Sequence, residues 1–435
     1  MRAWDTRSRR GRRHWTLLPL LAALLLSAAG CGGGYAASAG AGEVPTLVFA
    51  SGRDPLGVVD DMFQGCADAS GGRYRVEQLV LPPAVDAQRE QVIRRLAARD
   101  DSIDIIGMDV IWTAEFSRAG WLYDMTPHVS GMRDQYVPAS FATVEYDDRI
   151  WAAPHNTNVA MLYYRTDLVE QAPETWQELV QQVAAAREAN PDQEGFVWQA
   201  HEYEGFVVAM LEFLFGAGVE VLTPDGQASA LAASPAATEV MAFARDLFVG
   251  GTTPRSVTTF QEEEARQFFQ NGRGMFMRNW PYAWELVNSP GSEVAGKVAL
   301  APLPAWEGGS RAGVLGGLNW GVSAYSRHQE LAAELALCVT SEENQRRVAL
   351  EKSELPVLDV IYDDPEVQEK MPFIGVARES LNTARVRPVT PYYNDVTVAI
   401  ADYSHRVITG RADAGSTVQS LDRAISLAVI GEGEI

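Results

Sequence analysis

The sequence predicts an α/β fold of two domains, and three observations lead to this prediction. Short β-rich runs alternate with segments of helical periodicity, which is typical of a parallel sheet with helices on its faces. A length of 435 residues exceeds what one hydrophobic core usually supports, so two domains are expected. The composition, 47% hydrophobic and 21% charged, is that of a globular protein.

Strands and helices alternate in order through the first part of the chain after residue 45. We expect strands at Thr46–Ala50, Tyr74–Leu81 and Ile103–Ile106, one helix after Pro55 and another over 86–98. The ends of such strands direct loops to a shared crevice, which is where ligands bind in open α/β sheets.

Helical periodicity dominates the second part of the chain. The spacing of apolar residues predicts helices over 175–189, 204–215, 236–248, 261–270 and 329–339, and strands over 274–278 and 297–301. Asn271-Gly272 is a stop signal for the fourth of these helices.

The first thirty residues have the pattern of a secretory signal. Arginines at 7–13 precede an apolar run from Trp15, and small residues follow at 27–30. Gly30-Cys31 resembles a bacterial lipobox, in which the cysteine is lipidated and becomes the mature N-terminus; cleavage and release is the alternative. Residues 31–44 are then expected to be a flexible tether, and either export route, Sec or twin-arginine, remains open.

Two cysteines remain once Cys31 is assigned to lipid. Cys66 and Cys338 form an even pair in an oxidising compartment, so a disulfide between them is expected. Two separately buried thiols are the alternative.

The charge of the chain excludes one class of partner. The formal net charge is −21, and removing residues 1–30 leaves 30 basic and 56 acidic residues, or −26. Such a chain repels phosphate backbones, so no nucleic acid partner is expected. Only three of the basic residues are lysines, a bias that we attribute to codon usage.

Sequence motifs of enzymes are missing. The six histidines show no helical i, i+4 pair and no HExxH, and there is no GxSxG, Walker loop or GxGxxG after a strand. We therefore expect no metal, no cofactor and no catalytic residues. Glycosidase carboxylates need only a suitable separation in space, so a secreted carbohydrate-processing enzyme remains an alternative.

Polar and aromatic residues gather at predicted loop positions instead. They are Asp109 after a strand, Asn156 and Asn158 after Pro154, Glu262–Glu264 at a helix start, the run Arg278–Trp284 and the run Leu318–Trp320. Carboxylates, amides and guanidinium groups bind adjacent sugar hydroxyls, while aromatic faces lie against the apolar side of a sugar ring. The mixture favours a neutral polyol ligand.

Each candidate also has a purely structural interpretation. Asp109 could cap a helix, and acids in the first turn of a helix stabilise its dipole, which leaves Glu263 as the candidate of its triplet. Tryptophans usually belong to the core, which we expect for Trp112, Trp151 and Trp320.

Four blocks carry a family resemblance: SIDIIGMDVIWTAEFSRAGWL (102–122), WAAPHNTNVAMLYYRTDLV (151–169), FQNGRGMFMRNWPYAWELV (269–287) and RPVTPYY (387–393). From about Thr46 to the C-terminus, the chain resembles extracellular solute-binding proteins of bacterial ABC transporters, of the maltose- and trehalose-binding type. In particular, it is similar to the trehalose-binding lipoproteins of actinobacteria.

The resemblance implies a type II clam-shell of two lobes, each a mixed sheet flanked by helices, with three chain crossings. Lobe 1 would comprise 45–156 plus 302–367, and lobe 2 would comprise 157–301 plus 368–435. Cys66 and Cys338 then fall on neighbouring helices of lobe 1, which independently favours the disulfide.

The resemblance also implies the ligand-binding residues. In the first lobe and the segments that line the cleft they are Asp54, Arg89, Asp109, Asn158, Leu318 and Asn319. In the second lobe they are Tyr203, Glu263, Trp280, Tyr282 and Arg387.

The implied function is capture of a disaccharide, trehalose above others, and its delivery to the permease of an ABC importer. The protein would be a monomer outside the cytoplasm, held at the outer face of the cell membrane only through its N-terminal lipid. A binding protein for a non-sugar ligand, such as a peptide or polyamine, is a further alternative.

Overall fold

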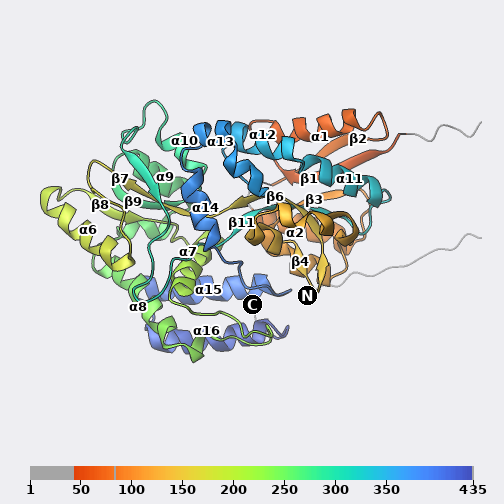
Figure 1. Cartoon of the computed structure of the whole chain (residues 1–435). Helices are drawn as coiled ribbons and strands as arrows, with labels where there is room; N and C mark the ends of the chain where they lie inside the picture. Colours follow the sequence, from red (N-terminus) through yellow and green to blue (C-terminus); the bar gives the residue numbers. More distant parts are fainter. Residues whose placement is uncertain (1–43, 83–84, 434–435) are drawn as a thin grey trace, which may run out of the picture. The chain divides into compact units, whose positions relative to one another are not determined.

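The computed structural model describes residues 44–82 and 85–433. The predicted signal peptide (1–30), Cys31 and the tether up to residue 43 lie outside the described residues. From Val44 onward the chain forms one compact unit with two main β-sheets, each beside its own hydrophobic core (Figure 1). Within this part, no helix combines the length and apolar character needed to cross a membrane.

We call the six-stranded sheet with its core the first lobe. Its strands lie in the order β12 (Leu355–Pro356), β6 (Ala152–Asn158), β11 (Gly316–Val322), β3 (Ile105–Asp109), β1 (Thr46–Gly52) and β2 (Arg75–Leu81). β1 pairs in parallel with β2 and β3, whereas β11 is antiparallel to β3 and β6. β3 is a continuous buried run, as expected for a strand covered on both faces.

Among residues 44–82 and 85–433, nine α-helices contribute to the first lobe or flank it. They are α1 (Val58–Ala69), α2 (Val85–Ala97), α3 (Thr113–Arg118), α4 (Thr126–Val129), α5 (Pro138–Ala142), α11 (Gln329–Val339), α12 (Glu342–Lys352), α13 (Pro365–Lys370) and α14 (Ile374–Asn382). Short 3₁₀ turns η1 (Val110–Trp112), η2 (Ser130–Gln135) and η5 (Asp359–Asp363) and a small hairpin, β4 (Glu145–Tyr146) with β5 (Arg149–Ile150), complete it.

We call the four-stranded sheet with its core the second lobe. Its strands lie in the order β10 (Val298–Ala301), β7 (Met161–Arg165), β9 (Gly274–Asn279) and β8 (Glu194–Val197). Its helices are α6 (Trp176–Ala189), α7 (Glu204–Gly216), α8 (Pro235–Val249), α9 (Glu262–Gln270), α10 (Ala283–Val287), α15 (Tyr393–Ile408) and α16 (Ala414–Ala428), with 3₁₀ turns η3 (Leu231–Ala233) and η4 (Arg255–Thr259).

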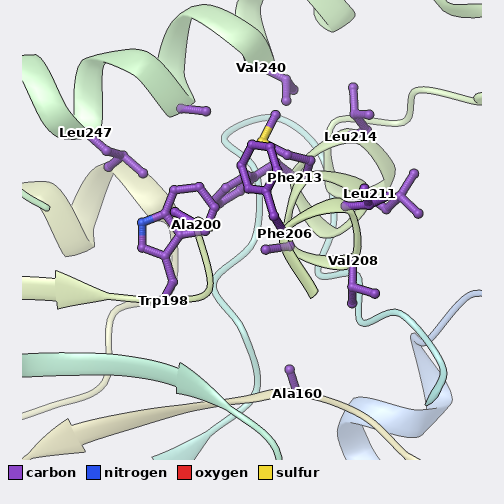
Figure 2. Close-up of a cluster of buried hydrophobic side chains, with 14 of the residues drawn as sticks. Ala160, Trp198, Ala200, Phe206, Val208, Leu211, Phe213, Leu214, Val240 and Leu247 are labelled. Atoms are coloured by element: carbon purple, nitrogen blue, oxygen red, sulfur yellow. The ribbon is translucent and has the colours of Figure 1, made fainter. Parts of the chain in front are cut away.

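Helix α7 is the centre of the second core. It is apolar around nearly its whole circumference, and every residue from Gly205 to Gly216 is buried. Figure 2 shows Phe206 and Phe213 of this helix beside Trp198, with Val240 and Leu247 of α8 nearby. A helix that is hydrophobic all round is stable only when it is covered on all sides, which the packing of α8 and α15 against it helps to achieve.

The described chain passes between the two lobes three times. Two crossings join β6 to β7 and β10 to β11, and the third lies between α14 and α15. The apolar face of α14, formed by Ile374, Ala377 and Leu381, packs in the first core. The chain therefore leaves the first core only after residue 382. The resemblance implies an earlier boundary for the third crossing, at residue 367.

A disulfide joins Cys66 of α1 to Cys338 of α11, with Cα atoms 5.9 Å apart, which confirms the expected pairing. The two helices pack against each other in the first lobe. The cross-link spans 272 residues of sequence and so ties the start of this lobe to the segment that returns to it after the second lobe.

His155 on β6 is buried in the first lobe. Its ring lies against Trp320 with centroids 5.3 Å apart. Burial, together with the ammonium of Lys352, lowers the pKa of His155 to about 3, although the carboxylate of Asp54 opposes both effects. The imidazole is therefore neutral in the folded protein at physiological pH.

The free energy of unfolding should fall when the pH falls below the normal pKa of histidine. Between that pKa and about 3, the unfolded chain binds a proton at His155 that the folded chain does not bind. From about pH 7 to about pH 5 this one group should remove about 2 kcal/mol. Denaturant unfolding of wild type and His155→Gln at both pH values measures it, and an equal loss in the two proteins would contradict the assignment.

Candidate functional site

A pocket of about 820 Å³ is lined by residues of both lobes. The first lobe contributes the loop 51–56 after β1, His155 and Asn156 of β6, Leu318 and Trp320 of β11, and residues 351–354 at the end of α12. The second lobe contributes Tyr282, Glu285 and Leu286 at the start of α10. The carboxyl end of β1 thus opens into a pocket, as the α/β arrangement predicts.

The pairing of β6 with β11 explains why two consecutive residues of β6 reach the same pocket. Leu318 pairs with Asn156 and Asn319 pairs with Pro154, so His155 is an extra residue in the ladder. Such a bulge re-aims side chains that would otherwise alternate between the two faces. Both His155 and Asn156 line the pocket as a result.

Gly317 allows the two strands to approach closely at this point. Its φ is +129°, and a Cβ atom there would lie 2.3 Å from the carbonyl oxygen of Asn156. Any side chain would therefore push β11 away from β6.

A chain of polar contacts crosses the first-lobe wall of the pocket. The ammonium of Lys352 lies 3.0 Å from Glu354 Oε1 and 3.6 Å from Asp54 Oδ2. Asn156 Nδ2 donates to Glu354 Oε2 at 2.5 Å, and Asn156 Oδ1 accepts from the backbone N–H of Leu318 at 2.7 Å. Side chains from three separate segments of the sequence and the backbone of a fourth are thereby fixed relative to one another.

Asp54 is held in place by its own backbone surroundings. It accepts hydrogen bonds from the backbone N–H groups of Leu56 and Val59, at 3.1 and 2.9 Å. Burial raises the pKa of Asp54, but the N–H of Val59 and the ammonium of Lys352 outweigh this, so its pKa lies below the usual value. A carboxylate at this position is ionised and can accept hydrogen bonds from hydroxyl groups.

The charges that line the pocket nearly balance. Its wall carries three cationic and four carboxylate side chains: Arg53, Lys352 and Lys370 against Asp54, Glu285, Glu351 and Glu354. A neutral ligand with many hydroxyl groups suits such a wall better than a strongly charged one, because every ion would gain a charge-assisted hydrogen bond without a net repulsion.

A second group of charges lies beside β11. Arg387 donates to Asp109 Oδ1 at 3.0 Å and to Glu204 Oε1 at 2.8 Å. Burial disfavours the guanidinium, but the two carboxylates outweigh this and raise the pKa of Arg387. Because Asp109 ends β3 and Glu204 begins α7, Arg387 connects the first lobe to the second through the third crossing.

Asp109 does not line the pocket itself, but it is the strand partner of Leu318, which does. It lies directly opposite Leu318 in the β3–β11 register, so the two side chains leave the sheet on the same face. It also caps η1 through the backbone N–H of Ile111. Within the described residues, both side-chain hydrogen bonds of Asp109 use Oδ1, so Oδ2 can accept from a ligand hydroxyl.

Aromatic side chains come from the second lobe. Tyr282 lines the pocket, and its hydroxyl donates to Glu263 Oε1 at 2.7 Å. Trp280 lies against β11, because a Cβ on Gly316 would be 3.6 Å from its ring. Asn158 is the partner of Gly316 in the β6–β11 ladder and so lies at the same place.

Glu263 and Tyr203 lie close to these aromatic residues. The guanidinium of Arg266 donates to Glu263 and, with the hydroxyl of Tyr282, lowers the pKa of this carboxyl. Tyr203 precedes α7, and burial together with the carboxylate of Glu262 raises the pKa of its hydroxyl.

Three of the eleven predicted residues, Asp54, Tyr282 and Leu318, line the pocket, and the other eight do not. Two of these eight, Arg89 and Asn319, are held by side chains elsewhere in the first lobe. Arg89 is engaged by Glu115 through two hydrogen bonds of 2.9 and 2.6 Å. Asn319 is buried and donates to Thr143 Oγ1 at 3.1 Å, because consecutive residues of a strand point to opposite faces and Leu318 takes the pocket side.

The sequence analysis did not include Lys352, Glu354 or Glu204 among the binding residues. One signal for Lys352 was present, since a lysine is rare in this chain and two of the three lysines line the pocket. Within the described residues, no group of three or more histidine, cysteine, aspartate and glutamate side chains is arranged to hold a metal ion.

Comparison with known proteins places this geometry in a family. Residues 83–346 match the model of the family described as bacterial extracellular solute-binding protein. A probable ABC transporter-binding protein of Deinococcus radiodurans is 32% identical over 405 residues, which are 89% of this chain and 94% of that protein. An arabinooligosaccharide-binding protein of Halalkalibacterium halodurans is 26% identical over 62% of this chain and 64% of its own length.

The solved structures show the same architecture. Maltose-bound MalE3 of T. maritima is 33% identical, with a TM-score of 0.80, and the match covers 88% of this chain and 99% of that chain. The predicted two-lobed type II fold is therefore confirmed. The chain belongs to the bacterial extracellular solute-binding proteins, and it is accordingly a binding protein and not an enzyme.

Proposed function

We propose that this protein captures a disaccharide, trehalose above others, and delivers it to the permease of an ABC importer. The observation that carries the proposal is the pocket of about 820 Å³, whose wall combines carboxylate, amide and ammonium groups of the first lobe with Tyr282 of the second. Polar groups of these kinds bind vicinal hydroxyls, and an aromatic ring packs on the C–H face of a sugar. Maltose in the similar T. maritima protein supports a glucose disaccharide.

The proposed mechanism is binding without chemistry. With the lobes apart, the ligand exchanges with solvent; a sugar that contacts both lobes shifts the population towards the closed state. We propose that the three crossings form the hinge, with lobe 1 at 45–156 plus 302–367 and lobe 2 at 157–301 plus 368–435. Residues 368–382 are an exception to these bounds: α14 packs in the first core, so we expect this segment to move with the first lobe. The permease would recognise the closed form, and a separate ATPase would supply energy.

We also propose that lipid on Cys31 anchors the protein at the outer face of the cell membrane. The signal-like segment before it and the glycine-rich stretch after it support this. Wild-type protein should be found in the membrane fraction with a lipidated N-terminal cysteine by mass spectrometry, whereas Cys31→Ala should not carry the lipid. An unmodified, released wild type would contradict the anchor.

Titration calorimetry of residues 44–435 against trehalose, maltose, maltotriose and glucose tests the proposed ligand. Trehalose should bind with a micromolar Kd or tighter, and glucose should bind much more weakly because it cannot contact both lobes. Tight binding of maltose in place of trehalose would keep the class of ligand and change its identity. No binding of any sugar by the folded protein would contradict the proposal and direct the search to peptides and polyamines.

Asp109→Ala should weaken binding of the sugar that wild type binds. The substitution removes the acceptor for a ligand hydroxyl and one of the two carboxylates that hold Arg387, and the loss should be about 1–3 kcal/mol, or tenfold or more in Kd. Asp413→Ala is the matched control, because Asp413 also accepts from a backbone N–H at a helix start, that of α16, but does not contact Arg387. Unchanged affinity in folded Asp109→Ala would remove Asp109 from the site.

A further inference from the structure

The lysines of this chain are placed unevenly. There are three among 36 basic residues, and two of them, Lys352 and Lys370, line the pocket. Lys370 is half-exposed and bound to Glu285 at the rim. The side chain of Lys352 is only 13% exposed, so it is the enclosed ammonium of the pocket wall.

The backbone around Lys352 is shaped to present it. Lys352 is the last residue of α12, and Ser353 after it has φ 53° and ψ 30°, a left-handed conformation that glycine usually takes at this position. A buried serine in this conformation stores strain, which is typical of functional sites. The reversal lets Lys352 and Glu354, on either side of Ser353, both line the pocket.

Stability alone does not account for this cluster. Removing charges from water costs free energy that an ion pair often fails to recover, so an apolar wall would fold at least as well. The Lys352 ammonium has three N–H donors, and its carboxylate contacts are one at 3.0 Å and one at 3.6 Å. One N–H of the Lys352 ammonium therefore remains for a third partner, and the pocket lies next to this ammonium.

We propose that Lys352 is a specificity-determining residue that donates a hydrogen bond to one hydroxyl of the bound sugar, while Glu354 accepts from the neighbouring hydroxyl. Asn156 and Asp54 act as positioning residues, because they hold Glu354 and the ammonium. The inference rests on the proposed sugar-binding function and names one subsite within it.

Lys352→Met tests the donor, and Lys297→Met is the matched control. Lys297 is the third lysine; it is exposed, contacts the carbonyl oxygen of Glu293 and does not line the pocket. Calorimetry with trehalose and maltose should show at least a tenfold rise in Kd for Lys352→Met and no change for Lys297→Met. Wild-type affinity in folded Lys352→Met would overturn the inference.

Monodeoxy analogues of the disaccharide that binds separate a direct contact from a structural effect. In wild type, the analogue that lacks the hydroxyl bound by Lys352 should bind about tenfold more weakly than the parent sugar. In Lys352→Met, that analogue and the parent should bind equally, whereas the other analogues keep their wild-type ratios.

Several outcomes of these measurements on wild type and Lys352→Met would overturn the inference. Ratios that are the same in wild type and variant for every analogue mean that Lys352 acts only on the fold. If Lys352→Met does not fold, Lys352→Leu is measured with the same analogues; leucine has no hydrogen-bond donor, so unchanged ratios there would again reject the contact. Wild-type protein that binds neither disaccharide overturns the proposed function itself, which distinguishes the two failures.

Discussion

The pairing of β11 with both β3 and β6 is the constraint on which the rest of the structure depends. In the sequence, β11 comes after all four strands of the second lobe, β7 to β10, yet in the structure it lies in the middle of the first sheet. Its register sets Leu318 opposite Asp109 on one side and opposite Asn156 on the other. A slip of one residue would turn Leu318 away from the pocket and bring Asn319 into it. Gly317 and the bulge at His155 fix this register, because both fit only one alignment of the two strands.

One group of buried ions lies at the boundary between the lobes and another lies inside the second lobe. Arg387 bridges Asp109 of the first lobe and Glu204 of the second, while Arg278 contacts Glu212 and Gln199 within the second lobe. Replacing such pairs with apolar residues is often neutral for stability, whereas removing one partner is costly. Such contacts fix geometry: the guanidinium of Arg387, bonded to Asp109 and Glu204, fixes the positions of both carboxylates. Burial raises the pKa of Glu204, and the guanidinium of Arg387 opposes that rise, so the ionisation of each partner depends on the other.

The sequence predicts the fold class and the strand ends well, because alternation of periodicities and polar residues after buried runs are local signals. Tyr282, which follows the end of β9, lines the pocket for this reason, whereas Asp54 and Leu318, which also line it, are implied by the family resemblance. Strands β6, β7 and β11 gave no such signal: β11 begins with two glycines, which disfavour strands, and it forms only because β3 and β6 flank it. Arg89 and Asn319 carried suitable chemistry, but their partners Glu115 and Thr143 are distant in sequence. Lys352 escaped prediction because helical periodicity does not reveal what the last residue of α12 faces.

The two lobes supply different chemistry to the same pocket, and this division connects binding to closure. The first-lobe wall is polar and held by hydrogen bonds within it, from Asp54 through Lys352 to Asn156. The second lobe supplies the ring of Tyr282, while Trp280 lies under the guanidinium of Arg278, 4.4 Å from its centroid. Stacking removes apolar surface from water only when the ring and the sugar are in contact, so an aromatic ring of the second lobe adds little until the lobes approach. In the proposed mechanism, a sugar held by hydroxyl contacts to the first lobe would gain its remaining affinity on closure, and that differential affinity would shift the population.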